Sequence, residues 1–326
     1  MNFVRNFTLL LAASLGLGAA PAASAAASDY PNRPIRLIVP NAPGSSVDTL
    51  GRIFAHAMTG VVKQQVVVDN RAGAGGIIGM EIGKDAPPDG YTLVSASTAA
   101  MVIAPHIHKK LPYDPLKDYE FISLFGNTPN ALVVNPSLPI KTVKELLDYN
   151  RSRGGKANMA SAGAGSQSHL AGVMFLSIAK SEALHVPYKG GGASVAAVVA
   201  GESQWTITPA PAVAGLVKSG KLRMIAHSLP ARTALLGDMP AIAETVPGYA
   251  YSGWNGLLAP RGTPKPILAK VRELLIKTTQ NAEFKAAFER QMTEVTTDTP
   301  EEFRKFVAGE IKAMGPVVKA AGLTVN

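Results

Sequence analysis

Short apolar runs alternate with amphipathic helical patterns along this chain of 326 residues, and this alternation constrains the fold most. Each run is bounded by Pro, Gly, Asn or Ser, which is typical of strands. The predicted strands are Ile35–Val39, Val66–Asp69, Thr92–Ala96, Ala131–Asn135, Ala157–Ser161, Leu184–Pro187, Ser203–Thr208, Arg223–His227 and Trp254–Ala259. Strands that alternate with helices predict an α/β fold with a largely parallel sheet.

The helical segments carry their own start signals. An apolar stripe at helical spacing predicts a helix after the first strand, with Val47, Leu50, Ile53, Phe54, Ala57 and Met58 on one face. Thr142 with Glu145, and Thr299 with Glu302, are spaced as capping boxes. Thr263 and Thr299 each precede a proline, so each is predicted to cap a helix that begins at that proline.

The first 25 residues have the pattern of a secretory signal peptide. Arg5 is their only charged residue, Thr8–Gly18 is leucine-rich, and Ala23-Ser24-Ala25 fits a cleavage site. The leucine-rich part is shorter than the roughly 20 residues that a membrane span needs, which favours cleavage over a retained anchor. The sequence therefore predicts cleavage near Ala25 and a periplasmic protein.

Composition excludes several classes of function. The chain has no cysteine, so disulfides and thiolate metal ligands are excluded. Its formal net charge is +9, but the lysines and arginines are scattered and form no basic stripe with aromatic residues. We therefore expect no nucleic-acid partner. About 300 residues remain after cleavage, which is enough for two domains.

Four loops carry Gly, Ser or Thr between a predicted strand and the start of a helix. They are Asn41–Ser46, Ser95–Ala99, Ser161–Ser168 and Thr208–Pro211. Ligands of open α/β sheets bind at the carboxyl ends of strands, where the N-termini of helices present unpaired amides. One such loop is typical of an ordinary helix cap, but four together favour a binding site for a small anion.

Motifs of other functions fail in detail. Gly73–Ile78 and Gly163–Ser168 begin like dinucleotide-binding loops but lack the last glycine. There is no G-x-S-x-G, and Ser177–Lys180 matches S-x-x-K only inside an apolar helical pattern. The six histidines are scattered, so we expect no metal and no cofactor.

Two histidines and two tryptophans leave alternatives open. His169 and His227 lie beside the predicted site, and each is more typical of a hydrogen-bonded structural histidine than of a ligand contact. Trp205 and Trp254 lie in strand patterns, which favours the core over a pocket.

At these loops the chain resembles the Bug receptors, the extracytoplasmic solute-binding proteins of tripartite tricarboxylate transporters. The matching stretches run in order through nearly the whole mature chain: Tyr30–Arg36, Ala42–Gly44, Val67–Gly76, Pro88–Leu93, Leu111–Pro115, Ser168–Gly172, His185–Gly190, Gly220–Arg223 and Gly256–Pro260. Each stretch is modest alone, and together they are specific.

The resemblance implies a two-lobed fold of the type II periplasmic binding protein class (a Venus flytrap), with a mostly parallel sheet in each lobe. Turn-forming stretches at Phe125–Pro129 and Val246–Tyr249 place the crossings between lobes. Lobe one would comprise 26–126 and 249–326, and lobe two 127–248. The lobes would hinge near Phe125–Thr128 and Pro247–Tyr249.

The resemblance also implies which residues hold the ligand. The contacts carried over are Ala42, Gly44, Ser45, Ser46, Ser97, Thr98, Ala99, Ser161, Ala162, Gly163, Gly165, Ser166 and Thr208, with Asn41 and His227 as further polar contacts. Asn41, Ser45-Ser46, Thr208 and His227 depart from the common family pattern, so the identity of the ligand stays open.

The function implied is capture of a small organic carboxylate, without catalysis, by a monomer that delivers it to the membrane components of a tripartite transporter. An exported serine-dependent hydrolase and a sensor that docks on a receptor ectodomain are the alternatives. The first three loops contain no Lys or Arg, so amides and hydroxyls are expected to hold the carboxylate. No loop offers a free carboxylate to an ammonium group, because Asp48 lies where it would serve its own helix, and this favours a non-amino acid ligand.

Overall fold

The computed structural model describes residues 29–320 and 322–323, so the predicted signal peptide lies outside the described residues. The strands are β1 (Ile35–Val39), β2 (Val66–Asn70), β3 (Thr92–Ser97), β4 (Tyr119–Val134), β5 (Asn158–Ser161), β6 (Leu184–Pro187), β7 (Trp205–Pro209), β8 (Arg223–His227) and β9 (Ser252–Pro260). The helices are α2 (Ser46–Val62), α3 (Ile77–Lys84), α4 (Ala104–Ile107), α5 (Val143–Ser152), α6 (Gln167–Ala179), α7 (Gly191–Ala200), α8 (Ala214–Lys218), α9 (Lys265–Gln280), α10 (Ala282–Arg290) and α11 (Pro300–Ala320). Within these ranges no helix combines the length and the apolar character needed to cross a bilayer.

The strands form one sheet in the order β2-β1-β3-β9-β4-β7-β5-β6, and β8 also pairs with β4. Parallel pairs lie toward the two ends of the sheet, where β1 joins β2 and β3, and β5 joins β6 and β7. The pairs that involve β4 and β9 are antiparallel. The α/β fold is as predicted, but the sheet is mixed rather than largely parallel. Strands β4 and β9 carry the chain from one half of the molecule to the other and back, and they run antiparallel to their neighbours.

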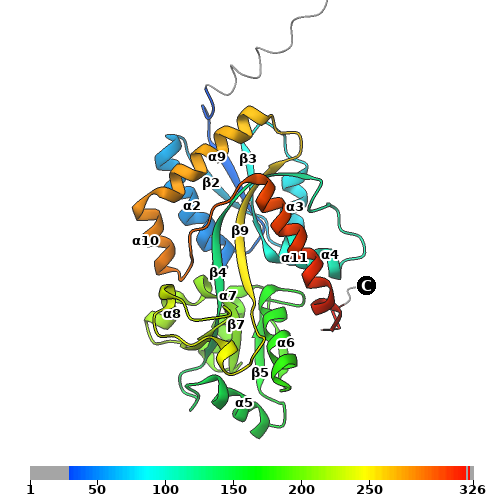
Figure 1. Cartoon of the computed structure of the whole chain (residues 1–326), viewed down its shortest axis with the longest axis vertical. Coiled ribbons are helices and arrows are strands. Elements are labelled where there is room, and N and C mark those ends of the chain that lie inside the picture. Colours follow the sequence, from blue (N-terminus) through cyan, green and yellow to red (C-terminus); the bar gives the residue numbers. More distant parts are fainter. Residues whose placement is uncertain (1–28, 321, 324–326) are drawn as a thin grey trace, which may run out of the picture.

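Strand β4 belongs to both halves of the molecule (Figure 1). It pairs with β9 as far as Pro129, and from Asn130 onward it pairs with β7 and β8. The crossing between lobes proposed at Phe125–Pro129 lies within β4, where pairing with β9 holds this stretch extended despite its turn-forming residues. The register of the pairing between β4 and β9 shifts between Leu124 and Gly126, which is an irregularity at the start of this turn-forming stretch. The lobe boundary proposed at 126/127 lies close to the change of partner on β4.

Helices cover both faces of the sheet and enclose its core. On one face α2, α9 and α10 bury Phe54, Phe284 and Phe288 against β4. On the other face one cluster runs through both halves and includes both tryptophans, Trp205 and Trp254. The prediction that these two side chains lie in the core is confirmed.

The helix starts follow the predicted caps with one exception. Capping boxes open α5 at Thr142 and α11 at Thr299. Helix α9 instead begins at Lys265, with Pro264 in the cap position. Thr263 does not cap it, because its hydroxyl donates to the carbonyl of Pro260 in the preceding turn.

Gly256 on β9 gives a test of this packing. A Cβ at this position would overlap the ring of Phe303 on α11, which is fully buried and held edge-on by Phe121 and Trp254. We expect Gly256→Ala to destabilise the protein by about 1–3 kcal/mol, as overpacking does. Gly215→Ala is the matched control, because a Cβ there meets no atom within 4 Å, and chemical unfolding should find it neutral or stabilising. Equal stability of the two variants would contradict this account.

Candidate functional site

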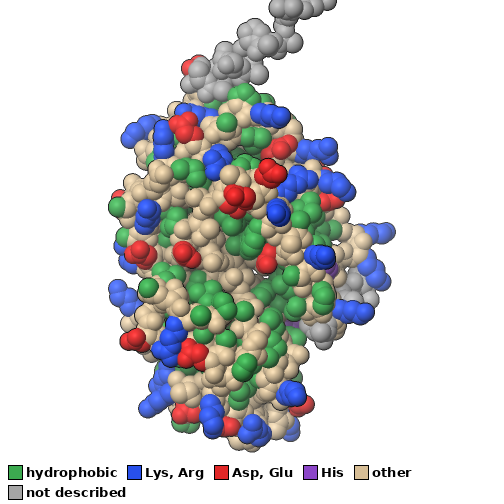
Figure 2. Space-filling view, in the orientation of Figure 1, with side chains coloured by type: hydrophobic (Ala, Val, Ile, Leu, Met, Phe, Trp, Pro, Cys, Tyr) green, Lys and Arg blue, Asp and Glu red, His purple; other side chains and the backbone are tan. Residues whose placement is uncertain are grey.

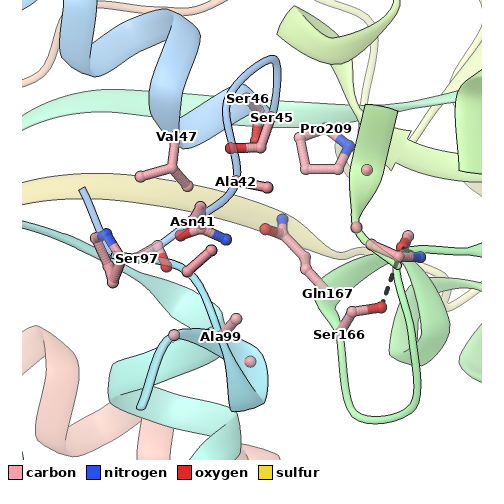
Figure 3. A pocket seen from close by; sticks show the side chains of 18 of the residues that line it. Asn41, Ala42, Ser45, Ser46, Val47, Ser97, Ala99, Ser166, Gln167 and Pro209 are labelled. Carbon is pink, nitrogen blue, oxygen red and sulfur yellow. Dashed lines mark hydrogen bonds between the residues drawn. The ribbon is translucent and has the colours of Figure 1, made fainter. Parts of the chain in front are cut away.

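A cavity of about 460 Å³ lies between the two halves of the molecule. From the first half it is lined by Pro40, Asn41, Ala42, Ser45, Ser46, Val47, Ala72, Gly73, Ala74, Gly75, Gly76, Ser97 and Ala99. From the second half it is lined by Ala162, Ser166, Gln167, Ser168, Lys189, Gly190, Gly191, Thr208, Pro209 and Ala212. Figure 3 shows loops and helix starts meeting there from both sides.

Most of the predicted site residues meet at this cavity. Asn41, Ala42, Ser45, Ser46, Ser97, Ala99, Ala162, Ser166 and Thr208 line it, whereas Gly44, Thr98, Ser161, Gly163, Gly165 and His227 do not. The hydroxyl of Thr98 is buried and accepts from the backbone amide of Trp254. The ring of His227 is fully buried at the end of β8 and accepts from the amide of Leu229 through Nδ1.

The loop after β1 is shaped by the start of α2. Ser45 caps the helix, since its hydroxyl accepts from the amide of Asp48. The amides of Ser46 and Val47 belong to the first turn, which has no intrahelical partners for its N–H groups. Both residues line the cavity, so the positive end of α2 faces it.

Asp48 serves this loop rather than the cavity. Its carboxylate accepts from the amide of Gly44 at 2.8 Å and from Asn70 Nδ2 at 2.8 Å, and it pairs with Arg52 at 2.9 Å. Burial opposes ionisation, but the hydrogen bonds from Arg52, Gly44 and Asn70 outweigh it and hold the pKa of Asp48 below its usual value. The carboxylate is therefore charged and fully engaged.

Two buried polar atoms of residues that line the cavity have no hydrogen-bond partner among the described residues. Ser97 ends β3, the residue is only 4% exposed, and its Oγ makes no hydrogen bond to the described residues. Oδ1 of Asn41 is also buried and makes no hydrogen bond to the described residues, and Asn41 lies near Ser97 in Figure 3. Unsatisfied buried polar atoms are uncommon in proteins, so these two are available to form hydrogen bonds to a molecule in the cavity.

In the second half, the first turn of α6 faces the cavity. Ser166 caps this helix by accepting from the amide of His169, and Ser168 accepts from the amide of Ala162. Between them, Gln167 extends into the cavity (Figure 3) and its Nε2 donates to Asn130 on β4 at 3.2 Å. This contact links the second half of the cavity wall to the strand that both halves share.

Behind this turn, two stacked histidines support the loop. The rings of His169 and His185 are parallel within 8° and 3.8 Å apart. His169 Nδ1 accepts from the amide of Gly165, and His185 Nε2 lies 2.6 Å from the hydroxyl of Ser161. Burial, with the neighbouring His185, lowers the pKa of His169 to about 4, and burial also lowers the pKa of His185. His169 is thus a hydrogen-bonded structural residue, as expected.

Sequence reasoning missed three parts of the wall. Ala72–Gly76 was considered only within a nucleotide motif and a family-matching stretch, and Gln167 and Lys189–Gly191 were not named as contacts. The three consecutive glycines after Lys189 were the available signal, because glycine at a helix start lets a ligand approach the backbone.

The charges around the cavity favour an anion. Among the lining residues, all of which are described, Lys189 alone is charged, and no aspartate or glutamate is present. The first three predicted loops contain no Lys or Arg, but Lys189 lines the cavity, so the expectation that amides and hydroxyls alone hold the carboxylate does not extend to the whole wall. On the face of the molecule that Figure 2 shows, positive and negative side chains are interspersed. Among the described residues no group of three or more acidic or histidine side chains is placed to hold a metal ion.

Two halves joined by crossing strands, with a cavity lined by helix starts between them, define a two-domain binding protein. The family model described as "Tripartite tricarboxylate transporter family receptor" matches residues 50–323. The chain is 34% identical over 322 residues to Protein BugT of Bordetella pertussis (strain Tohama I), and the alignment covers 97% of this chain and 98% of BugT. It belongs to this receptor family, and the resemblance to Bug receptors is confirmed.

Solved structures agree on the fold. One described as a periplasmic transporter is 35% identical, with a TM-score of 0.86 over 91% of this chain and all of the other. The R. palustris protein Rpa4515, determined with adipate, is 29% identical, with a TM-score of 0.86 and the same coverage. The two-domain periplasmic binding-protein fold predicted from the sequence is therefore confirmed.

The lowered pKa of His169 predicts a loss of stability in acid. Between about pH 6.5 and 4 the unfolded chain binds a proton that the folded ring does not, so stability present above pH 6.5 falls as the pH drops. The limiting slope is about 1.4 kcal/mol per pH unit. Thermal unfolding from pH 7.5 to 5 should show a weaker dependence in His169→Gln, while His56→Gln, at an exposed position on α2, should behave as the parent protein does. Identical slopes in all three proteins would refute the assignment.

Proposed function

We propose that this protein is a periplasmic solute receptor that captures a small organic carboxylate between its two domains. The observation that carries the proposal is the cavity itself. Helix N-termini and an unpartnered buried hydroxyl line it, and no acidic side chain does. Such an environment stabilises a carboxylate and disfavours a cation.

The size of the cavity and a relative support a small ligand. A volume of about 460 Å³ lies within the range of roughly 300–1,000 Å³ that is typical of small-molecule sites. Rpa4515, which shares the fold, was determined with adipate. A protein of the same fold therefore provides a precedent for a carboxylate ligand.

Delivery to a membrane transporter is the finer part of the proposal. The name of the family pairs its receptors with tripartite transporters. The signal-peptide pattern of the first 25 residues supports export to the periplasm, where such a receptor would meet its membrane components.

The serine-dependent hydrolase is the weaker alternative, although one contact favours it. Ser161 and His185 lie 2.6 Å apart, as a nucleophile and its base would. The side chain of Ser161 is fully buried, however, and it does not line the cavity. The pair instead supports the loop, and we propose binding without catalysis.

We expect removal of the Ser97 hydroxyl to weaken binding. A hydrogen bond to a charged group contributes about 1.5–3 kcal/mol, so Ser97→Ala should lower carboxylate affinity about tenfold or more in calorimetry. Ser95→Ala is the control, because Ser95 lies on the same strand with a buried, unpartnered hydroxyl but does not line the cavity. If both variants bound as the parent does, Ser97 would have no role in recognition.

A second expectation concerns the class of carboxylate. The ammonium group of a bound amino acid would find no free carboxylate in the cavity, because the carboxylate of Asp48 is engaged by Arg52, Asn70 and the amide of Gly44. Succinate should therefore bind at least about tenfold more tightly than aspartate, since burying an unpaired charge is costly. Tighter binding of aspartate that is lost in Asp48→Asn would give Asp48 an ammonium-binding role instead.

A further inference from the structure

The wall formed by the second half of the molecule carries a cation with no assigned role. Lys189 lines the cavity and is exposed, and within residues 29–320 no carboxylate lies within ion-pair distance of it. A lysine side chain is a mobile point charge on a four-carbon stem, so its ammonium group can follow a ligand in the cavity.

Next to Lys189, the first turn of α7 is built for close approach. Gly190 caps this ten-residue helix, and Gly190 and Gly191 both line the cavity. A Cβ at Gly191 would meet no atom within 4 Å, so the missing side chain leaves open space in front of the first-turn amides. The positive end of α7 and the ammonium of Lys189 thus favour an anion at the same place.

The opposite wall offers a separate place for an anion. There the first turn of α2 and the buried, unpartnered hydroxyl of Ser97 line the same cavity. The two walls approach each other at their rims, where a Cβ at Gly190 would lie 3.7 Å from that of Ala42. One small molecule can therefore reach both walls.

We propose that Lys189, together with the first turn of α7, binds a second anionic group of the ligand and so determines a preference for dicarboxylates over monocarboxylates. The proposal rests on the function proposed above and deepens it. Lys189 stays solvated when a monocarboxylate is bound, so the second charge is what it recognises.

The first test replaces the charge and keeps the shape. Calorimetry would compare adipate with hexanoate, and succinate with butanoate, on the full mature protein. We expect Lys189→Gln to weaken the tighter dicarboxylate about tenfold and its monocarboxylate partner less than about twofold. Lys189→Arg should retain most of the preference, and Lys156→Gln, at an exposed position outside the cavity, should leave it unchanged. The dicarboxylate affinity should also fall with added salt in the parent protein and less so in Lys189→Gln.

The second test blocks access of the ligand to the backbone amides in the first turn of α7. Gly191 and Gly192 both lie in the first turn of α7, and neither has a positive φ or an atom within 4 Å of a Cβ, but only Gly191 lines the cavity. Both alanine variants should fold, since alanine is favoured in helices. We expect Gly191→Ala to weaken the dicarboxylate about tenfold and Gly192→Ala to leave it unchanged.

The outcomes separate this inference from the proposed function. Binding of monocarboxylates as tightly as dicarboxylates, or an equal effect of Lys189→Gln on both, would overturn the role of Lys189 and leave carboxylate binding intact. Failure of the parent protein to bind any of the four acids would refute both proposals. Selective loss of the dicarboxylate in Lys189→Gln and Gly191→Ala, but not in their controls, would support the second anion site.

Discussion

The rest of the structure depends on the pairing of one long strand with partners from both halves. Strand β4 pairs with β9 up to Pro129 and with β7 and β8 from Asn130 onward. Because the same backbone continues through both sets of hydrogen bonds, the two halves are placed edge to edge and their loops meet at one cavity. Gln167 adds to this link by donating from the cavity wall to Asn130.

At the cavity, some polar groups form hydrogen bonds within the protein and others are left for a ligand. Ser45 and Ser166 use their hydroxyls to cap α2 and α6, which fixes the loops. The first-turn amides beyond these caps and the hydroxyl of Ser97 are left for a bound molecule. Rigid caps beside unsatisfied donors form a preorganised site, because the cost of ordering the loops is met on folding.

Charge follows the same division. Asp48 is buried beside the cavity, but Arg52, Asn70 and the amide of Gly44 neutralise and occupy its carboxylate. Lys189 has no such partner among the described residues, so the cavity presents net positive character from both walls. An organic anion is what this arrangement stabilises.

Local patterns in the sequence determined most of the elements. Apolar runs predicted the positions of β1, β6 and β8, and the spacing of Thr142 and Glu145 predicted the start of α5, because strand period and helix capping are short-range properties. Only the tertiary structure decided which loop residues face the cavity. Pairing with β9 overrode the turn propensity before Pro129, and burial turned Ser161 and His227 away from the cavity. Lys189 joined the wall because parallel pairing of β5 with β6 sets the start of α7 beside the loop after Ser161, a contact between segments that no local pattern encodes.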